Sequence, residues 1–516
     1  MSQSHQPCLY FFRTLAALSL AITICAAAAA SPIPSARATT RVTGPLTKNG
    51  YVNYVAKFNK RFGKGVTASN NAAVPLLILF RPNSFQCGAF KLVGRKVIYV
   101  PDKTFAHEMR RSLGISRRDL TGPRFISYQR FRRHADPAAV AQAVGDAGNL
   151  PPAPQFTSAR LYRHPWAAKA NPWSAAFLNT NAGALDIARS AFSRPHFFLP
   201  LLDAAGGDPG VATAVGALLP ALAPAKAICN GLAAQAMLAL HQGRLRRCRH
   251  DLLAIHRLAR LLTREHFLIT NLVAMSIKTM GCQADIAMAN SHKLSSEALH
   301  NYLNQLLTLP RPTSMGAAID TGERWTTLDV LQHASPNLAA LFGSAAPRKP
   351  AKPLNGAQRA AASASMNRLF DQVVEIFATK NYRQRALASH HALALWQHAK
   401  KPVDITFLFI VKTQARTIAM SARCAAFRRL DRLSLALAAY LEAHKTFPNH
   451  LSQLAPKFLP AIPRDPFTNK AFAYTTGPHG CTLSSPGGFS PPINPGVSLP
   501  PARPITVHLS PLPGEK

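Results

Sequence analysis

The spacing of apolar residues predicts that most of this chain is helical. Between 245 and 262 the apolar positions recur every three or four residues and therefore share one face of a helix, formed by Leu245, Cys248, Leu252, Ile255, Ala259 and Leu262. Similar stepping before Gln242-Gly243 predicts an antiparallel hairpin that turns at this glycine. Further helices are expected at 173–191, 211–241, 266–290, 295–308, 318–334, 366–399 and 404–443.

The segments around these helices carry other patterns. Residues 31–135 combine short helical segments with a strand candidate at 97–100, which indicates a small mixed α/β module before a helical body at 136–342. Ala, Pro, Lys and Ser dominate 343–365 and predict a linker. Long helices and a small α+β end are expected over 366–485, and the proline-rich stretch 486–516 predicts an extended tail. The expected fold class is mostly α, with a body of helical hairpins.

Residues 1–30 have the pattern of a secretory signal peptide. Arg13 is their only formal charge, and the run that follows it is apolar or small throughout. Small residues at Ala28 and Ala30 suit cleavage before Ser31, so we expect export to the periplasm or cell envelope. Without cleavage the segment would act as a membrane anchor. Beyond it, no apolar stretch approaches the roughly 20 residues of a spanning helix, which excludes a polytopic membrane protein.

The charge balance is the most unusual feature of the composition. The chain of 516 residues holds 60 Lys and Arg against 22 Asp and Glu, a formal charge of +38, and its 47% hydrophobic content excludes a fully disordered protein. Cations line the polar face of 245–262, a pattern that suits anionic lipid or phosphate, at Arg246, His250, Arg257, Arg260 and Arg264. The remaining cations are dispersed and are not interleaved with aromatic residues. We expect weak attraction to anionic surfaces and no specific nucleic acid.

Six cysteines would remain after cleavage: Cys87, Cys229, Cys248, Cys282, Cys424 and Cys481. Cys229 and Cys248 lie 14 and 5 residues from the turn at Gly243. On two antiparallel helices they would be roughly 13 Å apart along the axes, too far for a disulfide. We expect the helical cysteines to be buried free thiols, although an oxidising compartment would permit other pairings.

Short catalytic and metal-binding motifs are absent from the sequence. There is no Gly-x-Ser-x-Gly elbow, Walker loop, dinucleotide fingerprint or Cys pair at two-residue spacing. His107-Glu108 begins like a zincin helix, but Arg111 stands where the second histidine belongs. His391 and His398, beside His390, are about 10.5 Å apart along a helix, too far to share one ion. We therefore assign no catalytic, cofactor-binding or metal-binding residue.

Two carboxylate pairs allow competing interpretations. Asp371 and Glu375 share a helix face, and Asp320 precedes Glu323 by three residues within the segment IDTGERWTTLDVLQ. Such acids could form an acid–base site that is assembled only by the fold, as in a hydrolase. With so many cations available, each acid is more often an ion-pair partner. We favour ion pairs and keep the hydrolase as an alternative.

The C-terminal stretch resembles the globular end of the major pseudopilin of type II secretion. It reads LALAAYLEAHKTFPNHLSQLAPKFLPAIPRDPFTNKAFAYTTGPHGCTLSSPGG. The matching positions are the helix end at Tyr440, the turn at Phe447 and Pro448, Leu451, Leu454, the loop Pro463, Asp465, Pro466 and Phe467, and Tyr474 in a closing hairpin. The calcium loop of that family needs carboxylates. The segment SSPGGFSPPINPG has none, so neither calcium binding nor pilus assembly is expected.

The whole chain is also similar to a bacterial family of uncharacterised exported helical proteins with this pseudopilin-like end. The matching stretches are NGYVNYVAKFNKRFGKGVTASNNAAVPLL, NPWSAAFLNTNAGALDIARSAFSRPHFFLPLL, LAAQAMLALHQGRLRRCRHDLLAIHRLARLL and IDTGERWTTLDVLQ. The resemblance implies architecture and export but no activity. We expect a non-catalytic interaction or scaffold protein with an envelope protein as partner. A hydrolase and a protein that binds polyanions such as anionic lipid or nucleic acid are the alternatives, and the oligomeric state is left open.

Overall fold

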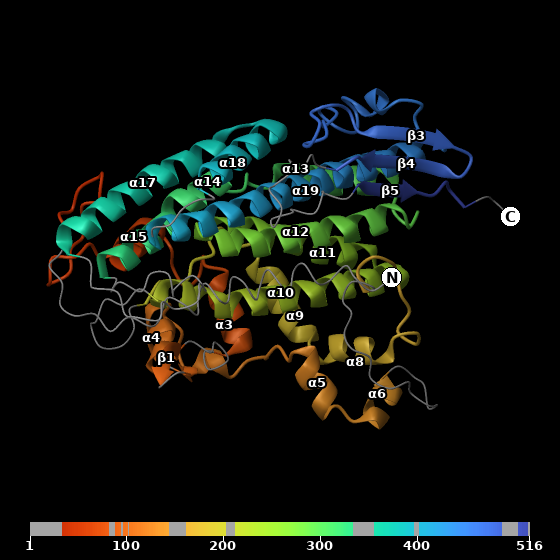
Figure 1. Ribbon diagram of the computed structural model, residues 1–516. Coiled ribbons are helices and arrows are strands. Elements are labelled where there is room, and N and C mark those ends of the chain that lie inside the picture. Colours follow the sequence, from red (N-terminus) through yellow and green to blue (C-terminus); the bar gives the residue numbers. More distant parts are fainter. Residues whose placement is uncertain are drawn as a thin grey trace.

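The computed structural model describes residues 33–81, 88–93, 96–101, 103–143, 161–202, 212–333, 355–396, 402–487 and 504–513. The predicted signal peptide and Cys87 lie outside these ranges. The described residues are mostly helical, with a small sheet near the C-terminus (Figure 1). The predicted fold class, mostly α with a small α+β end, is thus confirmed. None of the described helices is both long and apolar enough to span a membrane.

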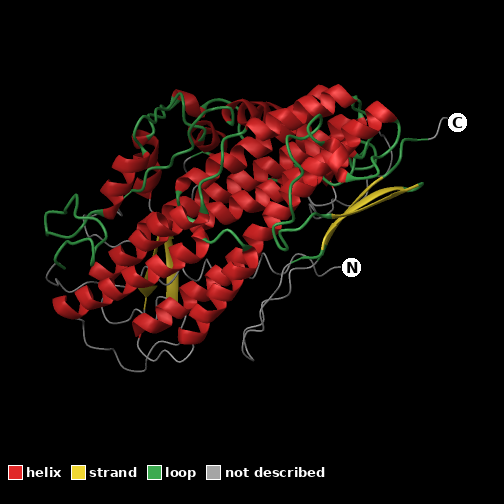
Figure 2. Ribbon diagram, turned by 90° about the horizontal axis from the view of Figure 1, so that it is seen from above, coloured by secondary structure: helices red, strands yellow, loops and turns green. Residues whose placement is uncertain are grey.

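Long helices packed side by side form the body (Figure 2). They are α10 Ala212–His241, α11 Leu245–Leu262, α12 Leu268–Ala289, α13 Ser296–Thr308 and α19 Pro402–His444. The predicted hairpin is present, because α10 packs on α11 and Gly243 takes the left-handed conformation (φ +72°) that the turn requires. On α11 the predicted stripe is buried, with Cys248, Leu252, Ile255 and Leu262 fully inaccessible to solvent. Cys229 and Cys248 are buried free thiols, as the spacing predicts.

The N-terminal segments supply a mixed layer against one side of this body. They comprise α2 Tyr54–Phe62, α3 Ala73–Phe80, the antiparallel strands β1 Gly88–Val93 and β2 Lys96–Pro101, α4 Lys103–Ser112, η2 Arg118–Leu120, α5 Tyr128–His134, α6 Pro137–Ala143, α8 Pro172–Thr180 and α9 Ala182–Ala191. The strand predicted at 97–100 is therefore confirmed. Phe58 of α2 packs on Phe267 at the start of α12, with 5.1 Å between ring centroids. The module and the helical body thus share one hydrophobic core.

A second group of helices covers the other side of α12 and α19. It contains α14 Met315–Ala318, the π-helical turn η4 Ile319–Glu323, α15 Arg324–His333, α17 Gly356–Ala378 and α18 Tyr382–Trp396. α17 begins inside the range 343–365 that its composition predicts to be a linker, so the prediction is wrong from 356 onward. Asn355 and Gln358 form a reciprocal capping box there, and alanine is the strongest helix former.

The C-terminal end is a three-stranded antiparallel sheet beside α19. After the turn η5 Leu451–Leu454, strands β3 Ala473–Gly477, β4 Gly480–Ser485 and β5 Ile505–Leu509 pair in the order β3-β4-β5. The Tyr474 hydroxyl donates a 2.7 Å hydrogen bond to the carbonyl of Pro448, which ties the sheet to the turn after α19. The predicted extended tail at 486–516 is wrong for β5, whose segment ITVHL contains no proline and alternates buried with exposed residues.

Candidate ligand pocket

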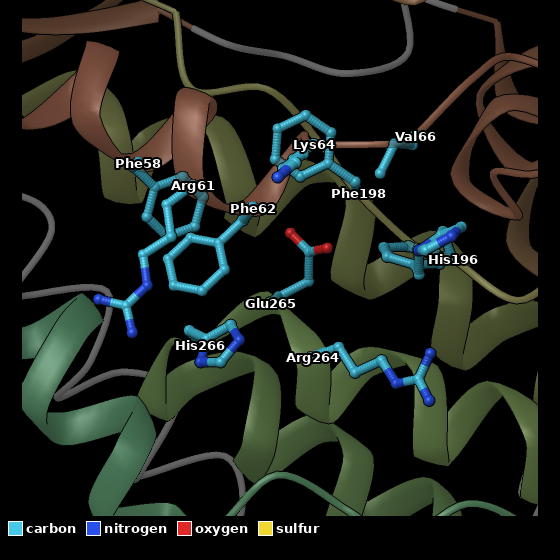
Figure 3. A pocket seen from close by; sticks show the side chains of 11 residues that line it. Phe58, Arg61, Phe62, Lys64, Val66, His196, Phe198, Arg264, Glu265 and His266 are labelled. Atoms are coloured by element: carbon cyan, nitrogen blue, oxygen red, sulfur yellow. The ribbon is translucent and has the colours of Figure 1, made fainter.

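A cavity of about 330 Å³ opens where α2 meets the turn between α11 and α12 (Figure 3). Besides α2 and this turn, the segment 196–198 also lines the cavity. The cavity is lined by Phe58, Arg61, Phe62, Lys64, Val66, His196, Phe197, Phe198, Arg264, Glu265 and His266. Its volume is within the range that small-molecule sites occupy.

The turn between α11 and α12 positions the two polar groups at the base of the cavity. Helix α11 continues into the 3₁₀ turn η3 Thr263–Glu265, and His266 then takes the left-handed conformation with φ +55°. This conformation is uncommon for a residue with a side chain. The His266 ring stacks on Phe62, with 4.0 Å between centroids and 27° between planes. The strained residue is thus held between its own turn and α2.

Glu265 is the most informative residue of the pocket. Its side chain is only 2% exposed, and Figure 3 shows the carboxyl pointing toward the centre of the cavity. The Oε2 atom has no hydrogen-bond partner among the described residues. Burial raises the pKa of this carboxyl well above its usual range, an effect opposed by a hydrogen bond that the carboxylate accepts from the backbone of Leu199. Glu265 therefore keeps its proton at pH values where an exposed glutamate is ionised, and it can act as a donor.

His266 is the second unsatisfied polar group. Its Nδ1 atom is buried and has no partner among the described residues. Burial, together with the nearby charge of Arg61, lowers the pKa of the imidazole to about 4. The ring is therefore neutral at physiological pH and can offer one donor or acceptor to a ligand.

Three cations also line the cavity. Arg61 lies over the rings of Phe62 and Trp325, at 5.2 and 5.7 Å from their centroids, and Arg264 donates a 2.6 Å hydrogen bond to the carbonyl of Pro195. Lys64 adds a third cation to the lining. Glu265 is the one acidic residue that lines the cavity. The pocket thus combines aromatic walls, a cationic rim and neutral hydrogen-bonding groups at its base.

The segment IDTGERWTTLDVLQ contacts the turn between α11 and α12 that carries Glu265 and His266. The backbone N–H of Gly322 donates a 3.1 Å hydrogen bond to the carbonyl of His266. A Cβ atom at Gly322 would lie 2.2 Å from that oxygen, so only glycine permits the approach. Glu323 accepts a 3.0 Å hydrogen bond from the backbone N–H of Leu268, one of the otherwise unpaired donors in the first turn of α12. Glu323 therefore positions the turn and is not part of an acid–base pair.

The other candidate acids have separate partners. Asp320 pairs with Arg41 at 3.3 Å and with Arg324 at 2.9 Å, and Asp371 pairs with Arg324 at 2.8 Å. The ion-pair interpretation is confirmed for these two acids. Glu375 on α17 is exposed. The structure does not bring Asp320 and Glu323 together in a shared cavity, since each has its own partner on a different element.

The histidine and arginine candidates are also separated. His107 and Glu108 are exposed on α4, the rings of His390 and His391 are 6.3 Å apart on α18, and His398 lies outside the described residues. On the polar face of α11, Arg246 and His250 are exposed. The other three cations are half-buried, and two of them donate to the 193–195 segment: Arg257 to the Ser193 hydroxyl (3.2 Å) and Arg264 to the Pro195 carbonyl. Much of the predicted basic face is therefore covered by the chain itself.

A buried polar network, missed by sequence reasoning, lies elsewhere in the core. Lys278 of α12 contacts His256 of α11, with 2.5 Å between Nζ and Nδ1. The Nε2 atom of His256 is 2.6 Å from Asp285, which also accepts a 2.7 Å hydrogen bond from Tyr302 of α13. The sequence signal that could have indicated this network is a lysine, Lys278, within the otherwise apolar helix LITNLVAMSIKTMGCQADIAMA. Unpaired charges are rarely fully buried.

Three groups of this network could in principle hold a metal ion. The donor atoms of His256, Asp285 and Asp431 all lie within 4.8 Å of one another. Both imidazole nitrogens of His256 are already engaged, by Lys278 and Asp285. Neither nitrogen is therefore free to bind a metal ion in this arrangement, and we assign no metal site here.

No protein family, curated protein or solved structure matches this chain. The function is therefore argued from the pocket and from the sequence.

Proposed function

We propose that this protein is a non-catalytic binding protein of the cell envelope. In this proposal the pocket of Figure 3 takes a small ligand that joins an anionic group to a flat apolar body. The single observation that carries the proposal is Glu265, a buried carboxyl with a raised pKa whose Oε2 has no partner among the described residues, at the base of a cation-rimmed cavity. A buried polar group without a partner costs about 1–3 kcal/mol. A ligand that accepts a hydrogen bond from it recovers that cost.

The composition of the pocket favours binding over hydrolysis. Two-carboxylate hydrolysis needs a second acid near the first, and Glu265 is the sole acid among the described residues of the lining. These residues also include no Ser, Thr or Cys that could serve as a nucleophile. Aromatic walls formed by Phe58, Phe62 and Phe198 suit a flat apolar body, and the rim cations suit a carboxylate or phosphate.

Benzoate is a suitable first probe because it has both parts of the expected ligand. We expect titration calorimetry on the full-length protein to detect benzoate and to detect benzamide, its uncharged isostere, only weakly. The substitution K64Q removes a rim charge and should weaken benzoate binding several-fold. The matched control K60Q removes an exposed lysine one turn earlier on α2, outside the lining, and should leave binding unchanged.

Two substitutions at Glu265 separate binding from proton transfer. Glutamine keeps the donor and the shape of a neutral glutamate, so E265Q should retain benzoate binding. E265A loses the donor and should weaken binding about tenfold, which corresponds to one hydrogen bond of about 1.4 kcal/mol. Equal affinity for benzoate and benzamide, or binding unaffected by both K64Q and E265A, would contradict the proposal.

The envelope part of the proposal depends on residues 1–30 and on the resemblance of the C-terminal end to a pseudopilin. We expect the intact mass of the native protein, taken from fractionated cells, to begin near Ser31 in a soluble envelope fraction. A full-length mass in the membrane fraction would replace a cleaved signal with an anchor. A full-length cytosolic protein would remove the envelope from the proposal and leave the ligand pocket to be judged by the benzoate measurements alone.

A further inference from the structure

A second cavity, of about 240 Å³, lies between α11, α12, α19 and the loop before α14. Its lining includes Arg260 from α11, Lys278 from α12, and Cys424 and Arg428 from α19. None of the described residues that line it is acidic. It is lined by residues different from those of the pocket in Figure 3, and its features are independent of the proposed function.

Lys278 connects this cavity to the buried polar network. The side chain is 8% exposed, and its Nζ atom is 2.5 Å from Nδ1 of His256. With Nζ of Lys278 as the donor, Nδ1 accepts and the imidazole proton is on Nε2. That proton is donated to Asp285 at 2.6 Å, and the Tyr302 hydroxyl donates to the other oxygen of Asp285 at 2.7 Å. An amine, an imidazole and a carboxylate are thus aligned in the order found in activated nucleophiles.

Burial favours a reactive amine at Lys278. It lowers the pKa of the ammonium, and the neighbouring guanidinium of Arg260 acts in the same direction, while Cys282, Asp431 and Asp285 oppose it. The groups that face the amine are His256 and Arg260 on α11, Cys282 and Asp285 on α12, and Asp431 on α19. Burial raises the pKa of the Cys424 thiol in the same cavity, so that group is a weaker nucleophile than an exposed cysteine.

Two arginines mark where an anionic group of the ligand would lie. Arg260 and Arg428 line the cavity, and neither forms an ion pair with an acid among the described residues. The Nε atoms of both are buried without hydrogen-bond partners in the same part of the chain. Guanidinium groups bind carboxylates through paired hydrogen bonds. A carboxylate held there would fix its ligand in the cavity that Lys278 lines.

We propose that Lys278 binds small 2-oxo acids covalently and reversibly, as an imine, in the cavity between α11, α12 and α19. The amine nitrogen attacks the carbonyl carbon and forms a C–N bond, while the π electron pair moves to the oxygen. His256 takes the first N–H proton and passes it to that oxygen, which gives a carbinolamine. The second N–H proton is passed in the same way to the hydroxyl, which leaves as water when the C–O bond breaks, and the imine forms. The balance is one amine and one carbonyl for one imine and one water, with no oxidation or reduction.

Borohydride trapping tests this site directly. The full-length protein is incubated with pyruvate and sodium borohydride, which reduces an imine to a stable secondary amine, and is then mapped by peptide mass spectrometry. We expect one dominant adduct at Lys278, absent in K278M and unchanged in the exposed-lysine control K380M. Acetone, which lacks the carboxylate, should label Lys278 at least tenfold more slowly than pyruvate does.

Two further variants guard against a folding artefact. R260Q should raise the pyruvate concentration needed for half-maximal labelling. H256Q should slow labelling at saturating pyruvate about tenfold or more. The helical circular dichroism spectrum should be preserved in both variants. Trapping at Lys278 should also persist at neutral pH, where exposed lysines react poorly. Labelling spread over surface lysines, or labelling of K278M equal to that of the unmodified sequence, would overturn the proposal. Neither result bears on benzoate binding in the first pocket.

Discussion

Among single residues, Glu265 determines the chemistry of the ligand pocket. Three cations line the same pocket, yet Glu265 forms no ion pair with any of them in the described part of the chain. The neutral form of a carboxyl is far less costly to bury than the ionised form. His266, with a pKa of about 4, is neutral as well. Burial thus disfavours a charge on both groups at the base of the pocket, and the rim carries the positive charge that would attract an anion.

This arrangement predicts a pH-dependent stability that E265Q removes. The folded pKa of Glu265 lies above its unfolded value, so unfolding releases a proton between the two values. The free energy of unfolding therefore falls as pH rises through that window. Near pH 8, E265Q should be more stable than the unmodified sequence, by about 1.4 kcal/mol for each pKa unit, and the difference should be smallest near pH 4. Urea unfolding at both pH values measures it.

The contribution of His266 to the free energy of unfolding depends on pH in the opposite direction, and the comparison with E265Q must account for it. Its folded pKa of about 4 lies below the unfolded value near 6.5, so its contribution to stability is lost as pH falls through this window. This loss affects both sequences equally and cancels in the difference. Parallel stability curves for E265Q and the unmodified sequence would show that Glu265 is ionised in the folded protein.

Residues of this kind could not be found from apolar periodicity. The pattern that predicts α11 counts the buried apolar positions and passes over His256, which lies on the same buried face. Glu265 falls in a short turn between two helices, and nothing local shows that α2 will cover it. The ion pairs of Asp320 and Asp371 were predictable, because an excess of cations makes such pairing the common outcome.

At the scale of elements, the pocket depends on contacts between segments distant in the sequence. The π-helical turn η4 approaches the turn between α11 and α12 so closely that their backbones form a hydrogen bond, from Gly322 to His266. Single π turns inside helices are often found at functional sites. Here the turn supports the left-handed His266, and Glu323 satisfies the start of α12. A segment without catalytic residues therefore positions the proposed ligand site.

The substitution G322A tests this contact. The new Cβ atom would lie 2.2 Å from the carbonyl oxygen of His266 and 2.8 Å from the ring of Phe267, so the two turns must separate. We expect a loss of about 1–3 kcal/mol in the free energy of unfolding, together with weaker benzoate binding because His266 moves. Thermal denaturation and calorimetry measure the two effects.

G356A is the matched control for G322A. Gly356 is the first residue of α17, and a Cβ atom there would contact nothing within 4 Å. Alanine at this position should therefore be neutral or stabilising by a few tenths of a kcal/mol. Equal effects of the two substitutions would show that the contact between η4 and His266 does not constrain the turn.

Most elements followed from sequence, and the exceptions have local causes. Long helices such as α11 and α19 were predictable because their apolar residues recur every three or four positions. The turn at Gly243 was predictable because its backbone takes a positive φ, which glycine adopts most readily. The start of α17 was not predicted because alanine and serine are common in both linkers and helices. The capping box between Asn355 and Gln358 that begins the helix emerges only from the structure. Strand β5 was not predicted because prolines dominate the composition of the tail around it. Its own five residues alternate between buried and exposed positions, as a strand requires.

For the whole molecule, the large positive charge raises the question of nucleic acid binding. Many arginines are engaged in holding irregular segments to helices, through hydrogen bonds to backbone carbonyls. Examples are Arg81 to Gly122, Arg194 to Ala68 and Asn71, Arg264 to Pro195, Arg385 to Thr379, and Arg429 to Arg464. Each such bond fixes a guanidinium against the protein and reduces its freedom to contact phosphate. The net charge of +38 therefore overstates the number of cations free to bind a polyanion.

Salt dependence of binding to a short DNA duplex distinguishes free cations from engaged ones. Each phosphate neutralised by the protein contributes about −0.9 to the slope of log K against log salt concentration. Arg246 on α11 is exposed, so R246Q should reduce the size of the slope by about one. Arg264, on the same face but bonded to Pro195, should leave the slope unchanged in R264Q while lowering thermal stability. A total slope beyond about −6, with R264Q as damaging to binding as R246Q, would mean that the engaged arginines also reach phosphate. Polyanion binding would then replace ligand binding as the leading function.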